Sequence, residues 1–220
     1  MDYVYRAIDI ETENTGIDIM KDNKRIISVQ IGDDIKQNLY WADSPKSAWN
    51  LTSAEKELSS LIAQGVIFAG YNIKGFDIPL LKQLLGIEIP QANWLDICQT
   101  PEMTKFHKLN KDWTLECACN KWLVDANHKQ KMNAKAEKYK TRQDIIEKAK
   151  AGAIEIKRTM TWLTPGEAYT KALKKLAGGN AVYDAYLEFK ESGGQKDTLF
   201  YEYAIGDIIS EFSLLKKLGY

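Results

Sequence analysis

The sequence predicts an α/β protein in which a mixed sheet of about five strands is flanked by helices. Three β-rich runs come first, and two short apolar runs then alternate with helical segments, which is typical of an α/β fold. The predicted strands are residues 4–10, 25–31, 37–41, 66–70 and 94–97. Residues 125–195 show helical patterns and no strand, and we interpret them as a helical insertion before the last helix.

The first three predicted strands form an antiparallel meander. Residues 4–10 alternate between the two faces of a strand and are rich in residues that favour strands. Gly32, Asp33 and Asp34 predict a turn between the second and third strands.

The central helices follow the meander. Thr52 or Ser53 is expected to cap a helix that ends at Gly65. Residues 77–85 are also predicted to be helical, and Gly86 is expected to stop that helix.

A further helix is predicted over residues 113–123. Its apolar stripe consists of Leu115, Ala118, Cys119, Trp122 and Leu123. We expect three tryptophans of this part of the chain to lie in the core, namely Trp94, Trp113 and Trp122.

The insertion is expected to contain three helices. Residues 133–150 predict one charged helix. Residues 164–167 (Thr-Pro-Gly-Glu) form a capping box with proline at the first helical position, and the helix that begins there is expected to end at residues 178–179. Residues 181–191 predict a third helix, and residues 198–218 predict the last helix of the chain.

Length and charge limit the class of protein. The 220 residues suit one domain, with a core of residues 1–124 and 196–220 that carries the insertion. The 30 basic and 30 acidic residues give no net charge, so nucleic-acid binding by bulk attraction is not expected and would require a local patch.

The cysteines, histidines and apolar runs argue against a disulfide-bonded, zinc-binding, secreted or membrane protein. Cys98, Cys117 and Cys119 are odd in number and form no Cys-x-x-Cys, so neither a disulfide framework nor a cysteine zinc site is expected. His107 and His128 have no metal-ligand spacing to one another or to a cysteine. With no secretory signal and no membrane-spanning run visible, we expect a soluble, cytoplasmic protein that does not bind membranes.

Asp9 and Glu11 lie two residues apart at the end of the first predicted strand. Residues i and i+2 of a strand point to the same face, so both carboxylates aim at one spot, while Ile8 and Ile10 point to the buried side. Two acids held together raise each other's pKa unless a cation lies between them. Because divalent cations such as Mg²⁺ prefer oxygen ligands, the pair indicates a metal site; a solvated strand end is the alternative.

A second candidate acid, Asp77, ends the run Asn-Ile-Lys-Gly-Phe-Asp that begins at Asn72. The run follows a short apolar strand and precedes a helix, so Asp77 lies in the first helical turn beside the sheet. The alternative is that Asp77 only caps the helix.

Tyr203 and Asp207 lie four residues apart in the last helix and therefore share one helical face. Gly206 costs the helix about 1 kcal/mol relative to alanine. A glycine at such a position indicates that another backbone or a ligand comes close. The alternative is a surface carboxylate near a half-buried tyrosine.

The three motifs together resemble the DEDD (DnaQ-like) 3′→5′ exonuclease superfamily. In order they read Asp-x-Glu, Asn-x-x-x-Phe-Asp and Tyr-x-x-x-Asp, on the first strand, a mid-chain helix and the last helix. The tyrosine matches the DEDDy branch, which includes the proofreading domains of family A and family B DNA polymerases. The other branch uses histidine, and neither histidine here stands shortly before Asp207. The resemblance covers residues 1–124 and 196–220 and implies a ribonuclease H-like fold.

The resemblance implies a site with two divalent metal ions, Mg²⁺ or Mn²⁺, for phosphodiester hydrolysis. Asp9 would bridge both ions, Glu11 and Asp207 would complete the first, and Asp77 would hold the second through water. Tyr203 would orient the attacking water and help to deprotonate it, although a free tyrosine with a pKa near 10 is a poor base at neutral pH without help.

Substrate contacts are expected at two places. The resemblance puts Asn72 near the substrate strand, and Phe76 either packs in the core or stacks on a terminal base. Residues 125–158 hold 10 Lys or Arg against 5 Asp or Glu, which is typical of a groove that follows phosphates. Lys138 and Arg142 are the candidates for those contacts; a solvated helical face is the alternative.

The expected substrate is single-stranded DNA or a frayed 3′ end, in replication proofreading or repair. A DNA polymerase or another replication or repair protein would then be a partner in trans. The alternatives are a 3′→5′ exoribonuclease that trims RNA, a non-catalytic module that binds nucleic acid or a polymerase, and an unrelated α/β protein whose four acids do not converge.

Overall fold

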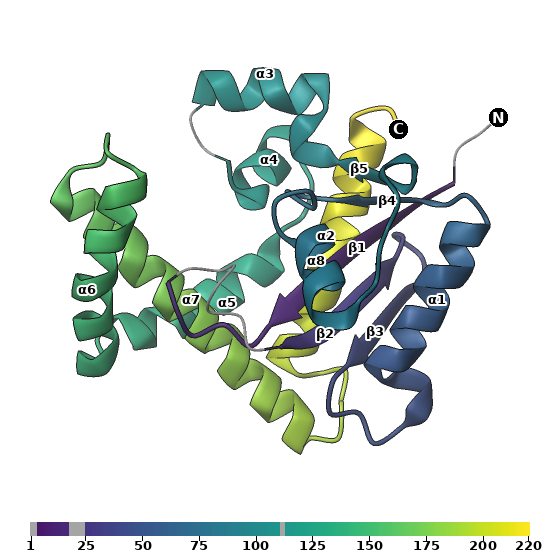
Figure 1. The fold of residues 1–220 in the computed structure, drawn as a ribbon, viewed down its shortest axis with the longest axis horizontal. Coiled ribbons are helices and arrows are strands. Elements are labelled where there is room, and N and C mark those ends of the chain that lie inside the picture. Colours follow the sequence, from purple (N-terminus) through teal and green to yellow (C-terminus); the bar gives the residue numbers. More distant parts are fainter. Residues whose placement is uncertain (1–3, 18–24, 111–112) are drawn as a thin grey trace.

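A five-stranded mixed sheet lies at the centre of the fold (Figure 1). The computed structural model describes residues 4–17, 25–110 and 113–220. The strands are β1 (Tyr5–Thr12), β2 (Ile26–Gly32), β3 (Gln37–Trp41), β4 (Ile67–Gly70) and β5 (Trp94–Asp96). They are ordered β3-β2-β1-β4-β5; the pairs in the β1–β2–β3 meander are antiparallel, and β4 runs parallel to both β1 and β5. The predicted α/β class and mixed five-stranded sheet are therefore confirmed.

Helices cover both faces of the sheet (Figure 1). The helices before the insertion are α1 (Leu51–Ala63), α2 (Asp77–Leu80) with a π-helical continuation over Leu81–Leu85, α3 (Pro101–Asn110) and α4 (Leu115–Trp122). The later helices are α5 (Asn127–Lys140), α6 (Gln143–Thr159), α7 (Pro165–Glu191) and α8 (Leu199–Lys217). The predicted strand-free insertion thus corresponds to α5, α6 and α7.

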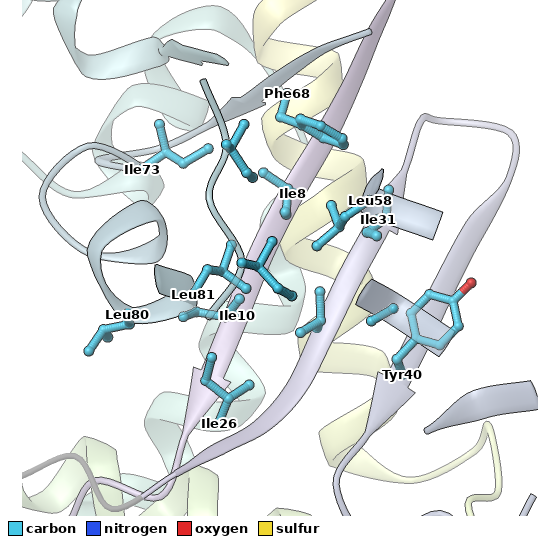
Figure 2. Packing of buried hydrophobic residues seen from close by; sticks show 14 residues of the cluster. Ile8, Ile10, Ile26, Ile31, Tyr40, Leu58, Phe68, Ile73, Leu80 and Leu81 are labelled. Carbon is cyan, nitrogen blue, oxygen red and sulfur yellow. The ribbon is translucent and has the colours of Figure 1, made fainter. Parts of the chain in front are cut away.

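The two faces of β1 have opposite character. Ile8 and Ile10 are buried in one hydrophobic cluster with side chains from α1 and α2, among them Leu58 and Leu80 (Figure 2). Because side chains alternate along a strand, Asp9 and the other odd-numbered residues face the opposite side. That side is covered by α8, which contacts β1, β2, β3 and β4.

The insertion packs on the same side of the sheet as α8. A second hydrophobic cluster joins Ile27 and Trp41 of the sheet with Met132 of α5, Tyr186 of α7 and Phe200 of α8. The distal part of the insertion has its own cluster, in which apolar side chains of α6 and α7 meet. The insertion therefore contributes α5 and α7 to the core beside α8, while α6 packs mainly on α7.

The helix boundaries inside the insertion differ from the prediction. The expected helix over residues 133–150 is two helices, α5 and α6, with a break at Thr141 and Arg142. The expected helix end at residues 178–179 is wrong, because α7 continues through both glycines and the predicted third helix is part of it. A Cβ at Gly179 would overlap the carbonyl oxygen of Asn14, so this glycine lets α7 approach the loop after β1. The predicted capping box at residues 164–167 is present.

Three expectations outside the insertion need correction. Helix α1 is capped by Asn50, whose side chain accepts a hydrogen bond from the Ser53 amide at 3.0 Å, and neither Thr52 nor Ser53 caps it. Helix α3 was not predicted. The expectation that Trp113 lies in the core is wrong, because Trp113 is 57% exposed and stacks on His107. Leu123 does not belong to the apolar stripe of α4, because it lies in the left-handed region at the end of that helix and is 89% exposed.

Trp94 and Trp122 are only half-buried, and both pack against hydrophobic clusters. In the part of the chain that the structure describes, no helix combines the length and apolar character needed to cross a membrane.

Candidate metal centre

Asp9, Glu11 and Asp207 converge at the face of β1 that α8 covers. One carboxylate oxygen of each lies within 4.8 Å of the others. Oxygen ligands lie about 2.0–2.1 Å from Mg²⁺, so two of them on one ion are separated by about 4.2 Å or less. Small side-chain adjustments would therefore let the three acids share a divalent ion, as the pattern of Asp9 and Glu11 predicts.

Asp77 approaches the same centre from the start of α2. It is only 3% exposed, and its Oδ1 atom accepts a hydrogen bond from the Ile10 amide at 3.0 Å. The pairing of β1 with β4 ends at Ala7, so Asp77 satisfies a strand amide beyond the last β4 partner. The alternative that Asp77 is only a helix cap is wrong, because Phe76 is at the cap position and Asp77 binds β1.

Gly206 packs against the ring of His128. A Cβ at Gly206 would overlap that imidazole, which explains the glycine in the middle of α8. A close approach is present at Gly206, but the approaching group is a side chain of α5 and not the expected backbone or ligand. Tyr203 and Asp207, on the neighbouring positions of α8, line one cleft with Asp9 and Glu11.

Two residues of α5 that the sequence did not assign to the site bind Asp207. The Nε2 atom of His128 lies 3.0 Å from Asp207 Oδ1, and it must donate there because an ionised carboxylate only accepts. The Lys129 ammonium donates to Asp207 Oδ2 at 2.6 Å and to the Tyr203 hydroxyl at 3.3 Å. No spacing rule links these residues, since 78 positions separate Lys129 from Asp207.

The acids on β1 and α2 all have raised pKa values. Burial, followed by the charge of Asp207, raises the pKa of Asp9 to about 8. Burial and the neighbouring carboxylates also raise the pKa of Glu11 and of Asp77 well above their ordinary values. The Oδ2 atom of Asp9 is buried and has no hydrogen-bond partner among the described residues. Divalent cations would offset the repulsion between the acids and give the Asp9 Oδ2 atom a partner, so the residues fit a metal site.

On α8, the pKa of Asp207 is lowered and that of Tyr203 is raised. Burial alone would raise the pKa of Asp207, but the Lys129 ammonium and His128 outweigh it and hold that pKa below its ordinary value. Burial raises the pKa of Tyr203 well above its ordinary value. At neutral pH the phenol therefore keeps its proton and can donate a hydrogen bond, but it cannot act as a base.

A cleft of about 550 Å³ is lined by Asp9, Glu11 and Asp207. Asn72 and Phe76, which precede α2 and which the resemblance assigned to substrate binding, also line it. Asn72 has a φ of +64°, in the left-handed region that asparagine tolerates, and its amide donates to Asp96 at 3.1 Å. Phe76 lines the cleft and also packs against the cluster around Ile8. The expected core packing of Phe76 is therefore present, and its stacking on a base stays a prediction.

Lys138 and Arg142 are not among the residues that line this cleft. Lys138 lies about two and a half helical turns beyond Lys129. Arg142 forms an ion pair with Asp144 at 2.9 Å. The insertion residues that do line the cleft are Lys129, Asn133 and Lys174.

No protein-family model matches the chain, and no curated protein matches it. The interpretation of the site therefore depends on its own motifs, geometry and electrostatics.

Proposed function

We propose that this protein is a metal-dependent 3′→5′ exonuclease that removes terminal nucleotides, with single-stranded DNA as the favoured substrate. The observation that carries the proposal is the convergence of Asp9, Glu11 and Asp207. They come from the first strand and the last helix, and they meet in a cleft where Asp207 and the unpartnered Oδ2 atom of Asp9 are buried. A ribonuclease H-like fold is part of the same proposal, supported by the five-stranded mixed sheet and by α8 across the face that bears the acids.

The acids would hold two divalent ions. Asp9, Glu11 and Asp207 are close enough to bind the first together, and Asp77, which is outside this group and bound to the Ile10 amide, would hold the second through water. When bound, two such ions stabilise the attacking and leaving oxygens of an in-line displacement at phosphorus and lower the pKa of a bound water.

The chain's own side chains would position the reacting groups. The Tyr203 hydroxyl, which keeps its proton, would orient the attacking water by hydrogen bonding. Lys129 fixes both Tyr203 and Asp207 and brings a positive charge to the cleft that a phosphate would enter. Asn72 and Phe76 would hold the end of the strand, the phenylalanine by stacking on a base.

The test uses 3′-labelled and 5′-labelled oligonucleotides of DNA and of RNA with equal sequence, in Mg²⁺, in Mn²⁺ and in EDTA. Asp9→Ala and Asp207→Ala remove metal ligands, and Glu202→Gln serves as the matched control because Glu202 is a carboxylate of α8 that pairs with Lys131 outside the cleft. We expect stepwise shortening from the 3′ end that EDTA and both alanine variants abolish and the control retains.

Shortening of RNA alone would replace DNA by RNA as the substrate. Binding of strands without shortening in either metal would contradict the exonuclease and favour a nucleic-acid-binding module.

A further inference from the structure

Glu211 is a buried carboxylate beside the four acids of the proposed site. It lies four residues after Asp207 in α8, so both side chains project from one helical face. It is only 3% exposed, and it lines the same cleft as Asp9 and Asp207. No motif pointed to it, because a glutamate in a helix has no distinctive spacing.

The two carboxylate oxygens of Glu211 have different surroundings. The Oε1 atom accepts a hydrogen bond from the Tyr71 amide at 3.0 Å, directly after the last residue of β4. The Oε2 atom is buried and has no hydrogen-bond partner among the described residues. A buried oxygen without a partner is costly, and more so when the group is charged. The Tyr71 bond thus fixes a side chain whose second oxygen lacks a partner.

The neighbourhood of that oxygen is negative. After burial itself, the charges of Asp9, Asp207 and Asp77 raise the pKa of Glu211 well above its ordinary value. A side chain that served only to accept the Tyr71 bond would work equally well as glutamine, without this repulsion. The carboxylate therefore indicates a cation.

Two divalent ions would balance the charges of the ionised acids and Lys129. The half-buried ammonium of Lys129 lowers the pKa values of Asp9, Glu11 and Asp207. Five ionised carboxylates and one ammonium leave four negative charges, which is the number that two divalent ions neutralise. With four carboxylates only, two divalent ions would leave an excess of positive charge.

We propose that Glu211 is a fifth acidic residue of the metal site, and that its Oε2 atom accepts a hydrogen bond from water bound to the ion that Asp9 and Asp77 hold. Contact through water fits the geometry, because Glu211 is not part of the group of three oxygens that lie within 4.8 Å of one another. Mg²⁺ commonly keeps several waters when carboxylates bind it. The inference depends on the divalent ions of the proposed function and not on hydrolysis.

The test is Mn²⁺ binding to Glu211→Gln, measured by the loss of the electron paramagnetic resonance signal of free Mn²⁺. Glutamine keeps an acceptor for the Tyr71 amide and removes the charge. We expect two Mn²⁺ sites in the parent protein and a loss of at least tenfold in affinity at one of them in the variant. Glu202→Gln, on the exposed side of the same helix, is expected to bind Mn²⁺ like the parent.

Thermal unfolding gives a second measurement, in which Glu211→Gln is expected to change the stability without metal and the effect of Mn²⁺ in opposite directions. Glu211→Gln removes a repulsive buried charge, so its unfolding temperature in EDTA is expected to rise, and the increase that Mn²⁺ produces is expected to shrink. If Glu211 only accepted the Tyr71 bond, Glu211→Gln would leave Mn²⁺ binding and the Mn²⁺-induced increase in unfolding temperature unchanged, and that result would overturn the proposal.

If Glu211→Gln does not fold, Glu211→Asp keeps the charge on a shorter side chain. We expect it to retain two Mn²⁺ sites with one of them weakened, and unchanged affinity at both would again overturn the proposal. Failure of the exonuclease is distinguishable: a parent protein that binds two Mn²⁺ but shortens no strand contradicts hydrolysis and leaves the role of Glu211 standing.

Discussion

The imidazole of His128 and the carboxylate of Asp207 lie 3.0 Å apart, although 79 residues separate them in the chain. This contact ties the first helix of the insertion to the last helix of the core. It also fixes the orientation of an acid that the proposed mechanism needs, because the Nε2–H group and the Lys129 ammonium bind it together. The insertion is therefore part of the candidate site and not only an addition to its surface.

Loss of the His128 contact is expected to weaken metal binding. His128→Phe keeps a ring beside Gly206 and removes the donor to Asp207, and partners that orient metal ligands typically contribute about 10–100-fold to affinity or activity. We expect Mn²⁺ affinity to fall about tenfold or more, measured by electron paramagnetic resonance, with the helical circular dichroism signal unchanged. Parent-like affinity in a folded variant would contradict this role of the imidazole.

Two glycine-to-alanine substitutions are expected to have opposite effects on stability. In Gly206→Ala the new methyl group overlaps the His128 ring, and overpacking typically costs about 1–3 kcal/mol. In Gly178→Ala the methyl group enters open space within α7. The helix preference of alanine is therefore expected to raise the free energy of unfolding by as much as about 1 kcal/mol. Urea unfolding measures both. Stabilisation by Gly206→Ala would show that α5 does not pack on α8 as described.

Without metal, stability is expected to fall as pH rises. The pKa of Asp9 is 3.8 ordinarily and about 8 in the folded protein, so its contribution is fully present below pH 3.8 and is lost as the pH rises to about 8. Glu11 and Asp77 act in the same direction, and Asp207 opposes them. Urea unfolding in EDTA between pH 5 and pH 8 is expected to show a smaller slope in Asp9→Asn.

Divalent metal is expected to counteract this pH dependence. Carboxylates bind a cation in their ionised form, so binding releases protons and stabilises the protein more at pH 8 than at pH 6. Thermal unfolding with and without Mn²⁺ at the two pH values measures the difference. An equal or larger Mn²⁺ effect at pH 6 would contradict the raised pKa of Asp9.

Removal of the Lys129 charge is expected to destabilise the metal-free protein. Lys129→Met leaves Asp207 with His128 as its remaining described hydrogen-bond partner, and breaking a buried ion pair typically costs about 3 kcal/mol or more. The matched control is Lys131→Met, which breaks only an exposed pair with Glu202 and is expected to change stability by less than about 1 kcal/mol. Urea unfolding in EDTA compares the two, and similar losses would contradict the buried pair.

The cleft lining predicts which insertion residues bind the substrate strand. Lys174→Ala is expected to raise KM for single-stranded DNA several-fold and to reduce the salt dependence of binding by about one phosphate contact. Lys138→Ala and Arg142→Ala are the comparison, since neither residue lines the cleft and Arg142 pairs with Asp144. A larger effect at Lys138 or Arg142 would restore the original sequence-based prediction that these two residues contact substrate.

Much of the core could be predicted because its signals are local. Alternation along β1 separates Ile8 and Ile10 from the two acids, and the capping box at Thr164 marks the start of α7. The errors have tertiary causes. Gly179 is a typical helix stop in isolation, but packing against Asn14 uses it within a continuous helix.

The sequence by itself determined where side chains point within each element: the shared face of Asp9 and Glu11 on a strand, and of Tyr203 and Asp207 on a helix. Only the tertiary structure decided that these faces meet, and that His128, Lys129 and Glu211 join them. The physical reason is that backbone periodicity fixes direction over a few residues. Contacts between distant segments depend instead on how the apolar faces of whole helices and strands are buried against one another.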